Sequence, residues 1–391
     1  MRALLLTLIC LPLYTLGQYG FEKIHLQSSE ASRVYRTLKS DNSINFLTTD
    51  STIFEWSTTS NALTTKRKPT GIFYPFNFPS SETVYGGENF FLLNIQTKQL
   101  YRVSPLHRLI DSIEIKISKK YIFSAHSYRS SQPIGIDESL NFIFLRSSPA
   151  EINLTNEKRW VTSTRKAFNT EGIISIYDLK TGEFIKAIGK YPEEYGENLV
   201  KTAHLEYTFD YDPRNHNLYV SFAGSGKILK YNAQTETSNW ILSNGNFIDD
   251  ESVNYFTPDP KQFFNRRSLV IEKDMYEDVF SINDSTIARI YKKGVIDTIS
   301  RKGRFYQYSD PKKQLCPLPQ IQSKLSKAYL YKPGFIQIIE KGILVKEIEC
   351  PRNIKDFLYK SGNILYFSAY LEKGENYFYK LTLEGLVFNK L

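Results

Sequence analysis

The chain has 391 residues, of which 41% are hydrophobic and 23% charged, with a formal net charge of +9. This balance excludes an extended disordered chain and a collagen-like repeat. Tyr (27) and Phe (26) are abundant, whereas Met (2) is nearly absent. Because aromatic and β-branched side chains suit the half-buried surface of a strand, the composition predicts an all-β protein. The sequence carries no motif that identifies a biochemical activity.

The first residues have the features of a secretory signal peptide. Arg2 precedes an apolar run from Ala3 to Leu13, and Thr15-Leu16-Gly17 offers a small-residue cleavage site. We therefore expect residues 1–17 to be removed and residues 18–391 to form one domain. The mature protein is then periplasmic or on the cell surface.

Two features of the sequence bear on membrane attachment. Cys10 follows Ile9, where a lipoprotein signal has a small residue, so the sequence argues against lipid anchoring. After the signal, no apolar run reaches the length of a transmembrane helix. The basic residues are scattered along the chain, and export further argues against a nucleic-acid partner.

Removal of the signal peptide leaves two cysteines, Cys316 and Cys350. In an exported protein they could form a disulfide, worth about 3 kcal/mol through the loop that it would close. They could equally be two buried thiols, and the sequence leaves both alternatives open. No Cys-x-x-Cys occurs, which argues against redox chemistry and thiolate metal sites.

The clearest structural pattern runs from Leu205 to Leu242. Four strand-like runs are separated by turn residues at Asp212-Pro213, Gly224 to Gly226 and Asn232 to Thr235. This pattern predicts a four-stranded antiparallel meander. Such a unit cannot bury both of its faces alone, and its recurrence is the signature of a β-propeller.

Similar units recur along the chain and predict a propeller of six four-stranded blades, with seven blades as the alternative. The units lie near residues 30–68, 70–117, 120–190, 200–243, 265–350 and 354–391. The third and fifth units carry insertions, and a long polar loop spans 243–268. Phe21 to Gln27 alternates like a strand and could pair with the last blade to close the ring.

Two stretches have an incomplete resemblance to ligand-binding loops. Ala223 to Lys227 (AGSGK) lacks the first glycine of a phosphate loop and stands between strands, which predicts a hairpin turn. Tyr211 to Asn217 (YDPRNHN) lacks the glycine of a calcium loop and is also interpreted as a turn. No His-Glu-x-x-His motif or Gly-x-Ser-x-Gly elbow is present, so no motif requires a cofactor.

The histidines and tryptophans supply weaker candidates for a site. His204 and Glu206 precede the best-formed blade and could face the central channel, although a structural histidine is the favoured interpretation. Trp56, Trp160 and Trp240 are interpreted as packing residues, although aromatic faces can also stack on sugars.

The stretch Ala187 to Glu197 (AIGKYPEEYGE) joins the third unit to the fourth. Side chains of adjacent residues in an extended segment point to opposite sides, so Glu193 and Glu194 are poorly placed for joint acid–base chemistry. Gly189 and Pro192 are interpreted as turn residues. The binding candidates in this region are Lys190, Tyr191, Glu193, Glu194 and Tyr195, with Tyr191 and Tyr195 also expected to pack the crossing.

With IYDLKTGEFIKA before it and FDYDPRNHNLYVSF after it, this stretch resembles exported bacterial propeller-like proteins of the domain of unknown function 4221 family. More distantly, the chain is similar to six-bladed propellers with NHL-type repeats. The resemblance is sharpest at Gly189 to Tyr195. It implies a propeller fold and export, commonly as a lipoprotein, and it implies no established activity.

Two functions are compatible with these observations. We favour a non-enzymatic, monomeric scaffold that binds an envelope protein, peptide or glycan through its loops, because recognition residues concentrate on loops of rigid scaffolds. The alternative is a propeller lyase or lactone hydrolase with a divalent cation in the central channel, held by acidic and amide side chains.

Overall fold

The computed structural model describes part of the chain, and its elements there are strands. The described residues are 20–25, 34–40, 43–48, 53–57, 62–67, 81–86, 89–94, 97–104, 108–123, 134–149, 172–193, 207–243, 275–293, 334–351, 353–361, 364–369 and 377–383. The predicted signal peptide lies outside them, as do the two expected insertions and nearly all of the loop 243–268. No helix among these residues is long and apolar enough to cross a membrane.

Five antiparallel sheets have four strands each, and a further sheet has five. The first two four-stranded sheets contain β2 (Val34–Ser40), β3 (Ser43–Thr48), β4 (Ile53–Ser57), β5 (Ala62–Arg67), and β6 (Ser81–Gly86), β7 (Asn89–Asn94), β8 (Gln99–Val103), β9 (Leu109–Glu114). The next two contain β15 (Tyr207–Asp212), β16 (Asn217–Phe222), β17 (Lys227–Asn232), β18 (Thr237–Leu242), and β19 (Met275–Ser281), β20 (Thr286–Lys292), β21 (Gly334–Glu340), β22 (Ile343–Glu349). The last combines β23 (Ile354–Ser361), β24 (Ile364–Ala369) and β25 (Tyr377–Thr382) with β1 (Phe21–His25).

The prediction of six four-stranded blades, with seven as the alternative, is therefore wrong: the described strands form five four-stranded blades and one sheet of five strands, with no seventh sheet. The five-stranded sheet contains β10 (Tyr121–Phe123), β11 (Ile134–Asp137), β12 (Phe142–Pro149), β13 (Ile174–Asp178) and β14 (Phe184–Ile188). β12 is long enough to pair with β11 through its first half and with β10 through its last three residues. Two short strands therefore share one edge of β12.

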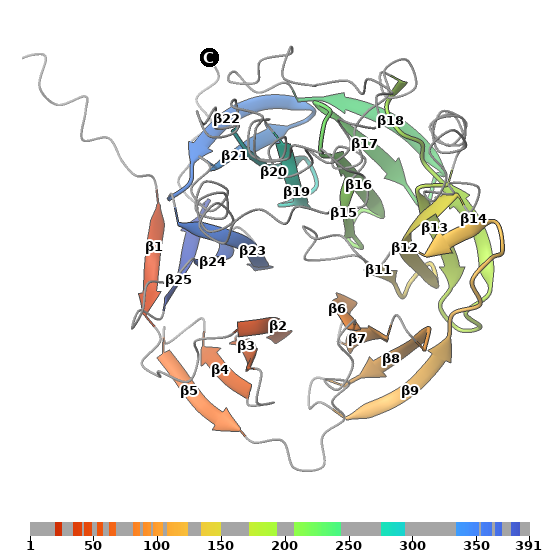
Figure 1. Ribbon diagram of the computed structural model, residues 1–391, viewed down its shortest axis with the longest axis horizontal. Helices are drawn as coiled ribbons and strands as arrows, with labels where there is room; N and C mark the ends of the chain where they lie inside the picture. Colours follow the sequence, from red (N-terminus) through yellow and green to blue (C-terminus); the bar gives the residue numbers. More distant parts are fainter. Residues whose placement is uncertain are drawn as a thin grey trace, which may run out of the picture.

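The sheets are arranged as the blades of a propeller around a centre (Figure 1). The innermost strands contact one another in turn: β2 with β6, β6 with β11, β11 with β15, and β15 with β19. β2 also contacts β23, the innermost strand of the last sheet, so the first and last sheets are neighbours. The chain therefore follows a closed ring, and the boundaries predicted for the units match the sheets.

Burial decreases from the inner to the outer strands of a blade. Every residue of β15 and β16 is buried, whereas five of the six residues of β18 are exposed. Inner strands lie between two neighbouring blades, so both of their faces are covered and the burial pattern does not alternate. Apolar clusters fill the spaces between neighbouring sheets, such as the one that joins Phe144 and Ile176 to Phe209 and Val220.

The N-terminal strand closes the ring, as the sequence predicted. β1 pairs with β25 in antiparallel register, with Phe21 opposite Leu381. Ile24 is 5% exposed, and the ring of Phe21 lies 5.8 Å from that of Phe367. Residues from the two ends of the chain thus complete one sheet and cover an edge that would otherwise be unpaired.

A buried arginine explains why the AGSGK stretch is a turn between β16 and β17, as predicted. Arg289 of β20 is fully buried, and its guanidinium lies 3.2 Å from the ring centroid of Tyr276. It donates to three backbone oxygens of the neighbouring blade, those of Phe222 (3.1 Å), Ser225 (2.6 Å) and Gly226 (3.0 Å). The carbonyl groups of this turn therefore bind the guanidinium of Arg289. In a phosphate loop, by contrast, the backbone amides bind an anion.

Replacement of Ile24 tests the closure of the ring. Ile24→Ala should lower the free energy of unfolding by about 2–4 kcal/mol, because it removes a buried branched side chain from the pairing of β1 with β25. Urea unfolding measures the change. Glu22→Ala on the same strand, whose side chain is half exposed, is the control and should change stability by less than about 1 kcal/mol. Equal effects of the two changes would contradict the closure.

Replacement of Arg289 tests the contact between the β16–β17 turn and the next blade. Arg289→Met keeps most of the volume but leaves buried carbonyl oxygens without their donor, so it should destabilise the fold by about 2–4 kcal/mol. Lys119→Met, at an exposed position, should stay within about 0.5 kcal/mol of the wild type. The midpoints of urea unfolding compare the variants, and a neutral Arg289→Met would refute the role of the guanidinium.

Candidate binding surface

The two faces of the ring differ in the length of their connections. Because neighbouring strands run antiparallel, connections after the first and third strands of a blade leave on one face, and those after the second and fourth leave on the other. We call these the hairpin face and the connection face. On the hairpin face, short turns join Asp212 to Asn217, Ser281 to Thr286 and Glu340 to Ile343. On the connection face, much longer segments separate Pro149 from Ile174, Leu242 from Met275 and Lys292 from Gly334.

The segment after β14 lies on the connection face and contains the predicted binding candidates. Tyr191 is 5% exposed and packs edge-on against Tyr207, with ring centroids 5.8 Å apart. It also contacts Phe222, again at 5.8 Å. Tyr191 therefore anchors the crossing between two blades, whereas Lys190 and Glu193 reach solvent and form a weak ion pair of 3.8 Å.

Gly189 gives this segment its course. Its φ of +72° lies in the left-handed region, which glycine adopts without strain. A Cβ at this position would come within 2.9 Å of Leu229 and 3.0 Å of Ile173, in the two blades on either side of the crossing. The glycine thus permits both the turn and the close approach of the blades, as its interpretation as a turn residue required.

The structure adds Leu242 to this surface and shows that Trp240, which the sequence analysis interpreted as a packing residue, belongs to it as well. Trp240 is 37% exposed and Leu242 is 59% exposed, both on the outer strand β18. The ring of Trp240 lies 5.9 Å from that of Phe222, the residue that Tyr191 also contacts. The interpretation of Trp240 as a packing residue is therefore only partly right. The exposure of Trp240 could have been expected from its place in the last strand of a blade, because neighbouring blades cover that strand least.

The structure describes only some of the predicted site residues. It brings together Lys190, Tyr191 and Glu193 in one segment. Glu194, Tyr195, His204 and Glu206 lie outside the described residues, and so does Trp160. Their roles remain predictions.

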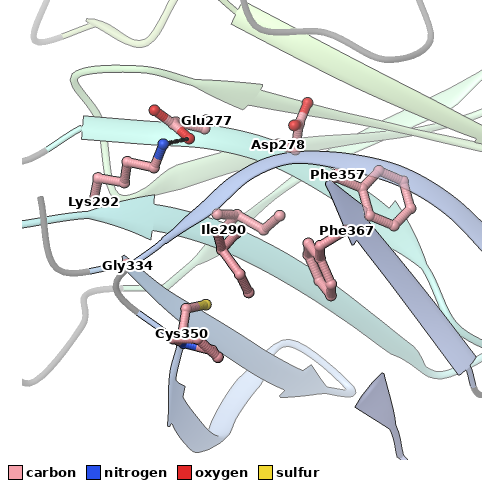
Figure 2. Close-up of a pocket in the computed structure, with 10 residues that line it drawn as sticks. Glu277, Asp278, Ile290, Lys292, Gly334, Cys350, Phe357 and Phe367 are labelled. Atoms are coloured by element: carbon pink, nitrogen blue, oxygen red, sulfur yellow. Dashed lines mark ion pairs between the residues drawn. The ribbon is translucent and has the colours of Figure 1, made fainter. Parts of the chain in front are cut away.

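Beneath the connection face, a small cavity lies where the β19–β22 blade meets the last sheet (Figure 2). Glu277 and Lys292 form an ion pair of 3.2 Å at its edge, with side chains 12% and 8% exposed. Phe357 and Phe367 line its apolar side. The cavity volume of about 10 Å³ suffices for a single water molecule and excludes an organic ligand. The cavity is therefore part of the packing between blades.

Cys350 lines the same cavity and is a buried free thiol in the structure. Burial raises the pKa of this thiol, so it stays protonated and unreactive at neutral pH. Cys316 lies outside the described residues, and a disulfide between the two stays one of the two alternatives that the sequence left open.

Three inner strands bring charged groups together near the centre of the ring. Asp210 of β15 accepts a hydrogen bond from the backbone nitrogen of Ser281 in β19, at 2.7 Å. The ammonium of Lys360 in β23 lies 3.4 Å from the same carboxylate and donates to the backbone oxygen of Ser281. Burial raises the pKa of Asp210, and the positive charge of Lys360 opposes this effect. Asp210, Ser281 and Lys360 therefore connect the inner strands of three blades through hydrogen bonds and an ion pair.

The neighbouring carboxylate of Asp212 is also engaged. Arg214 donates to both of its oxygens, at 2.8 and 2.6 Å, and the Ser281 hydroxyl donates to one of them at 2.6 Å. Burial alone would raise the pKa of Asp212, but the hydrogen bonds from Arg214 and Ser281 hold it below its usual value. Among the described residues, no group of three or more His, Cys, Asp or Glu side chains is arranged to hold a metal ion.

Asp137 forms the corresponding contact between β11 and the next blade. One carboxylate oxygen accepts a hydrogen bond from Tyr211 and lies 2.7 Å from Nδ1 of His216, both in the β15–β16 hairpin. Ser139 and the backbone of Leu140 donate to the other oxygen. Burial would raise the pKa of Asp137, but these hydrogen bonds together lower it. The YDPRNHN stretch is therefore a turn that docks on a buried carboxylate, which confirms the interpretation as a turn.

This network predicts a pH dependence of stability. Since the folded-state pKa of Asp137 is lowered, its contribution is present above the unfolded pKa, near 3.9, and is lost as the pH falls through the folded value. Asp137→Asn should cost about 1–3 kcal/mol at pH 7, and the difference from wild type should shrink on acidification. Urea unfolding at pH 7, 5, 4 and 3 measures it. Asp111→Asn, at a half-exposed site, is the control, and a difference that does not vary with pH would disprove the role of the carboxylate.

Comparison with known proteins agrees with the propeller fold. No protein-family model matches the chain, and no curated protein matches it. Among solved structures, a DUF4221 family member from Bacteroides vulgatus shares 13% identity and covers 94% of this chain and 98% of its own, with a TM-score of 0.59. A Bacteroides fragilis protein to which export has been ascribed shares 8% identity, with 92% and 94% coverage and a TM-score of 0.50. At these identities the likeness shows the fold alone: this chain has the β-propeller architecture of those two proteins.

Proposed function

We propose that the chain is an exported propeller scaffold that binds a protein, peptide or glycan through its connection face. The observation that carries the proposal is the asymmetry of the two faces. The described strands of the hairpin face are joined by short turns throughout, whereas the connection face has the long segments after β12, β18 and β20 beside a few short turns such as Phe222 to Lys227. Loops on a rigid scaffold are the usual place for recognition, because they vary in length and sequence without disturbing the core.

The described part of this face offers groups of the kind that interfaces use. Trp240 and Leu242 are exposed at the outer strand of one blade, and Lys190 and Glu193 are exposed in the segment that leads into that blade. Tyr191 and Phe222 hold the patch to the core through ring contacts. Rigid aromatic anchors with charged neighbours are typical of the residues that dominate binding energy.

Export and the family are parts of the same proposal. The signal-like residues 1–17 end shortly before β1, which begins at Phe21, so cleavage would leave the ring-closing strand intact. The ascribed export of the Bacteroides fragilis protein supports this reading. The fold likeness to the DUF4221 member, together with the Gly189 to Tyr195 stretch, supports membership in that family.

The alternative, a lyase or hydrolase with a divalent cation in the channel, receives no comparable support. The inner-strand carboxylates Asp210 and Asp212 already face Lys360 and Arg214. A second cation would have to displace an ammonium or a guanidinium that is hydrogen-bonded there. Metal content of the purified protein remains the direct test of this alternative.

Shortening one long connection tests the binding proposal. Residues 246–268 are replaced by a short Gly-Ser linker, which leaves the hydrogen bonds of Ser243 in place. The immobilised full chain and this variant are each incubated with envelope extract, and the variant should lose the partner that the full chain retains. Trp240→Ala should weaken binding of the same partner by about tenfold or more, as expected for an aromatic anchor.

The matched control changes the hairpin face. Lys180→Ala and Thr235→Ala alter exposed turn residues there and should leave binding unchanged. Urea unfolding confirms that each variant is folded. Binding that persists when every long connection is shortened would refute the proposal.

A further inference from the structure

A groove of about 490 Å³ lies along β18, between this strand and the turns of the next blade. One wall is β18 itself, from Asn239 to Leu242. The other wall is formed by the two turns of the next blade, at Asp284–Ser285 and Lys341–Gly342. Tyr219, Ile287 and Ile339 form its floor. Its volume is in the range of small-ligand and peptide sites.

The lining of the groove shows that it follows the edge of β18 that is not paired with another described strand. Side chains of consecutive strand residues point to opposite faces, yet Asn239, Trp240, Ile241 and Leu242 all line the groove. Asn239 and Ile241 share a face with Lys230 and Ile228, their partners in β17. Trp240 and Leu242 must therefore line the groove with their backbone atoms.

The hydrogen-bond register gives the direction of that backbone. Ser243 donates to the backbone oxygen of Gly226 at 3.0 Å, so it belongs to a hydrogen-bonded pair. In an antiparallel ladder such pairs alternate, which turns the N–H and C=O groups of Leu242 and Trp240 away from β17. β18 pairs with β17 alone among the described strands, so these groups face the groove.

The opposite wall is preorganised. The backbone nitrogen of Lys341 donates to the oxygen of Ser285 at 2.7 Å and ties the two turns together. The side-chain oxygen of Asn283 accepts from the backbone nitrogens of Ser285 and Thr286, at 3.0 and 2.9 Å. Little conformational entropy is therefore lost at this wall when a ligand enters.

The charges of the groove favour an acidic ligand. Lys230 and Lys341 both line it, and Asp284 is the one carboxylate among the described residues of its lining. The ammonium of Lys230 lies 5.8 Å from the ring centroid of Tyr219, so it stands directly above the floor. An extended strand in the groove would have every second side chain on this face.

We propose that β18 binds an extended acidic peptide segment by strand addition. The peptide pairs with the outward N–H and C=O groups of Trp240 and Leu242, and an acidic side chain lies between Lys230 and Lys341. Backbone pairing supplies affinity and the lysines supply selectivity for acidic sequence. This site lies on the other side of β18 from the Tyr191–Trp240 patch and does not depend on the function proposed for the connection face.

Synthetic peptides test the proposal without any change to the protein. The probe is a capped, fluorescein-labelled hexapeptide of alternating glutamate and valine, and binding is followed by fluorescence anisotropy. The controls are the same peptide with lysine in place of glutamate, and one with alternate amides N-methylated. The acidic peptide should bind saturably, and both controls should bind at least tenfold more weakly. Absence of saturable binding, or equal binding of either control, overturns the proposal.

A matched pair of variants at Leu242 then locates the site. Leu242→Pro removes the outward N–H but keeps the ladder to β17, as edge strands tolerate proline on their free side. Leu242→Ala removes the side chain and keeps the N–H. The proline variant should bind the acidic peptide about five- to tenfold more weakly, and the alanine variant within about twofold of wild type.

Charge is tested separately. The double variant Lys230→Gln, Lys341→Gln should bind the acidic peptide about tenfold more weakly. Raised salt should weaken binding of the same peptide to the wild type in the same way. Lys119→Gln, remote from the groove, is the charge control. Binding that is indifferent to the two lysines, or equally weakened by the proline and alanine variants, would place the peptide elsewhere and overturn the proposal.

Discussion

The burial of two faces for every blade is the constraint on which this structure depends. A blade such as β15–β18 has apolar side chains on both sides of its inner strands, so it needs a neighbour on each side. A ring meets this need only if it closes. The pairing of β1 with β25 is therefore more than a detail of one sheet, since it allows the first and last sheets to cover each other. Buried polar groups follow the same logic, because Asp137, Asp212 and Arg289 each bind atoms of the adjacent blade.

The hairpin face and the connection face differ in what their connections contain. On the hairpin face, short turns carry the side chains that join neighbouring blades, such as His216 next to Asp137 and Arg214 on the backbone oxygen of Ile282. Substitutions there would disturb several blades at once. On the connection face, the crossing at Gly189 is the tightly packed point, and the long segments leave from strand ends around it. Changes in the sequence and length of these segments can accumulate on that face while the contacts between blades stay the same.

Much of the architecture could be predicted because local rules determine it. Turn residues mark the hairpins at Asp212–Asn217 and Phe222–Lys227, and alternation in Phe21 to Gln27 indicated the closing strand. The five-stranded sheet could not be predicted in the same way. Its extra strand β10 depends on the length of β12, which offers two partners along one edge, and this is a matter of tertiary pairing.

The candidate site was less predictable than the fold. The packing of Tyr191 followed from its place between two turns, but the exposure of Trp240 depends on how far the neighbouring blade extends, which one strand does not reveal. The outward backbone of Leu242 likewise follows from the register with β17, fixed by the hydrogen bond of Ser243. The buried Arg289 and the partly buried Lys360 have partners distant in the sequence, so no local pattern could identify their contacts.

The closing strand also imposes an order on the formation of the molecule. Phe21 pairs with Leu381, so β1 cannot find its partner until β25, far along the chain, has been made. Until then, the first and last sheets each lack a neighbour and the apolar side of β25 lacks Ile24. Contacts between such distant residues form slowly, because the intervening chain must first be ordered. The ring can therefore close only after the strands from β2 to β25 have all been made.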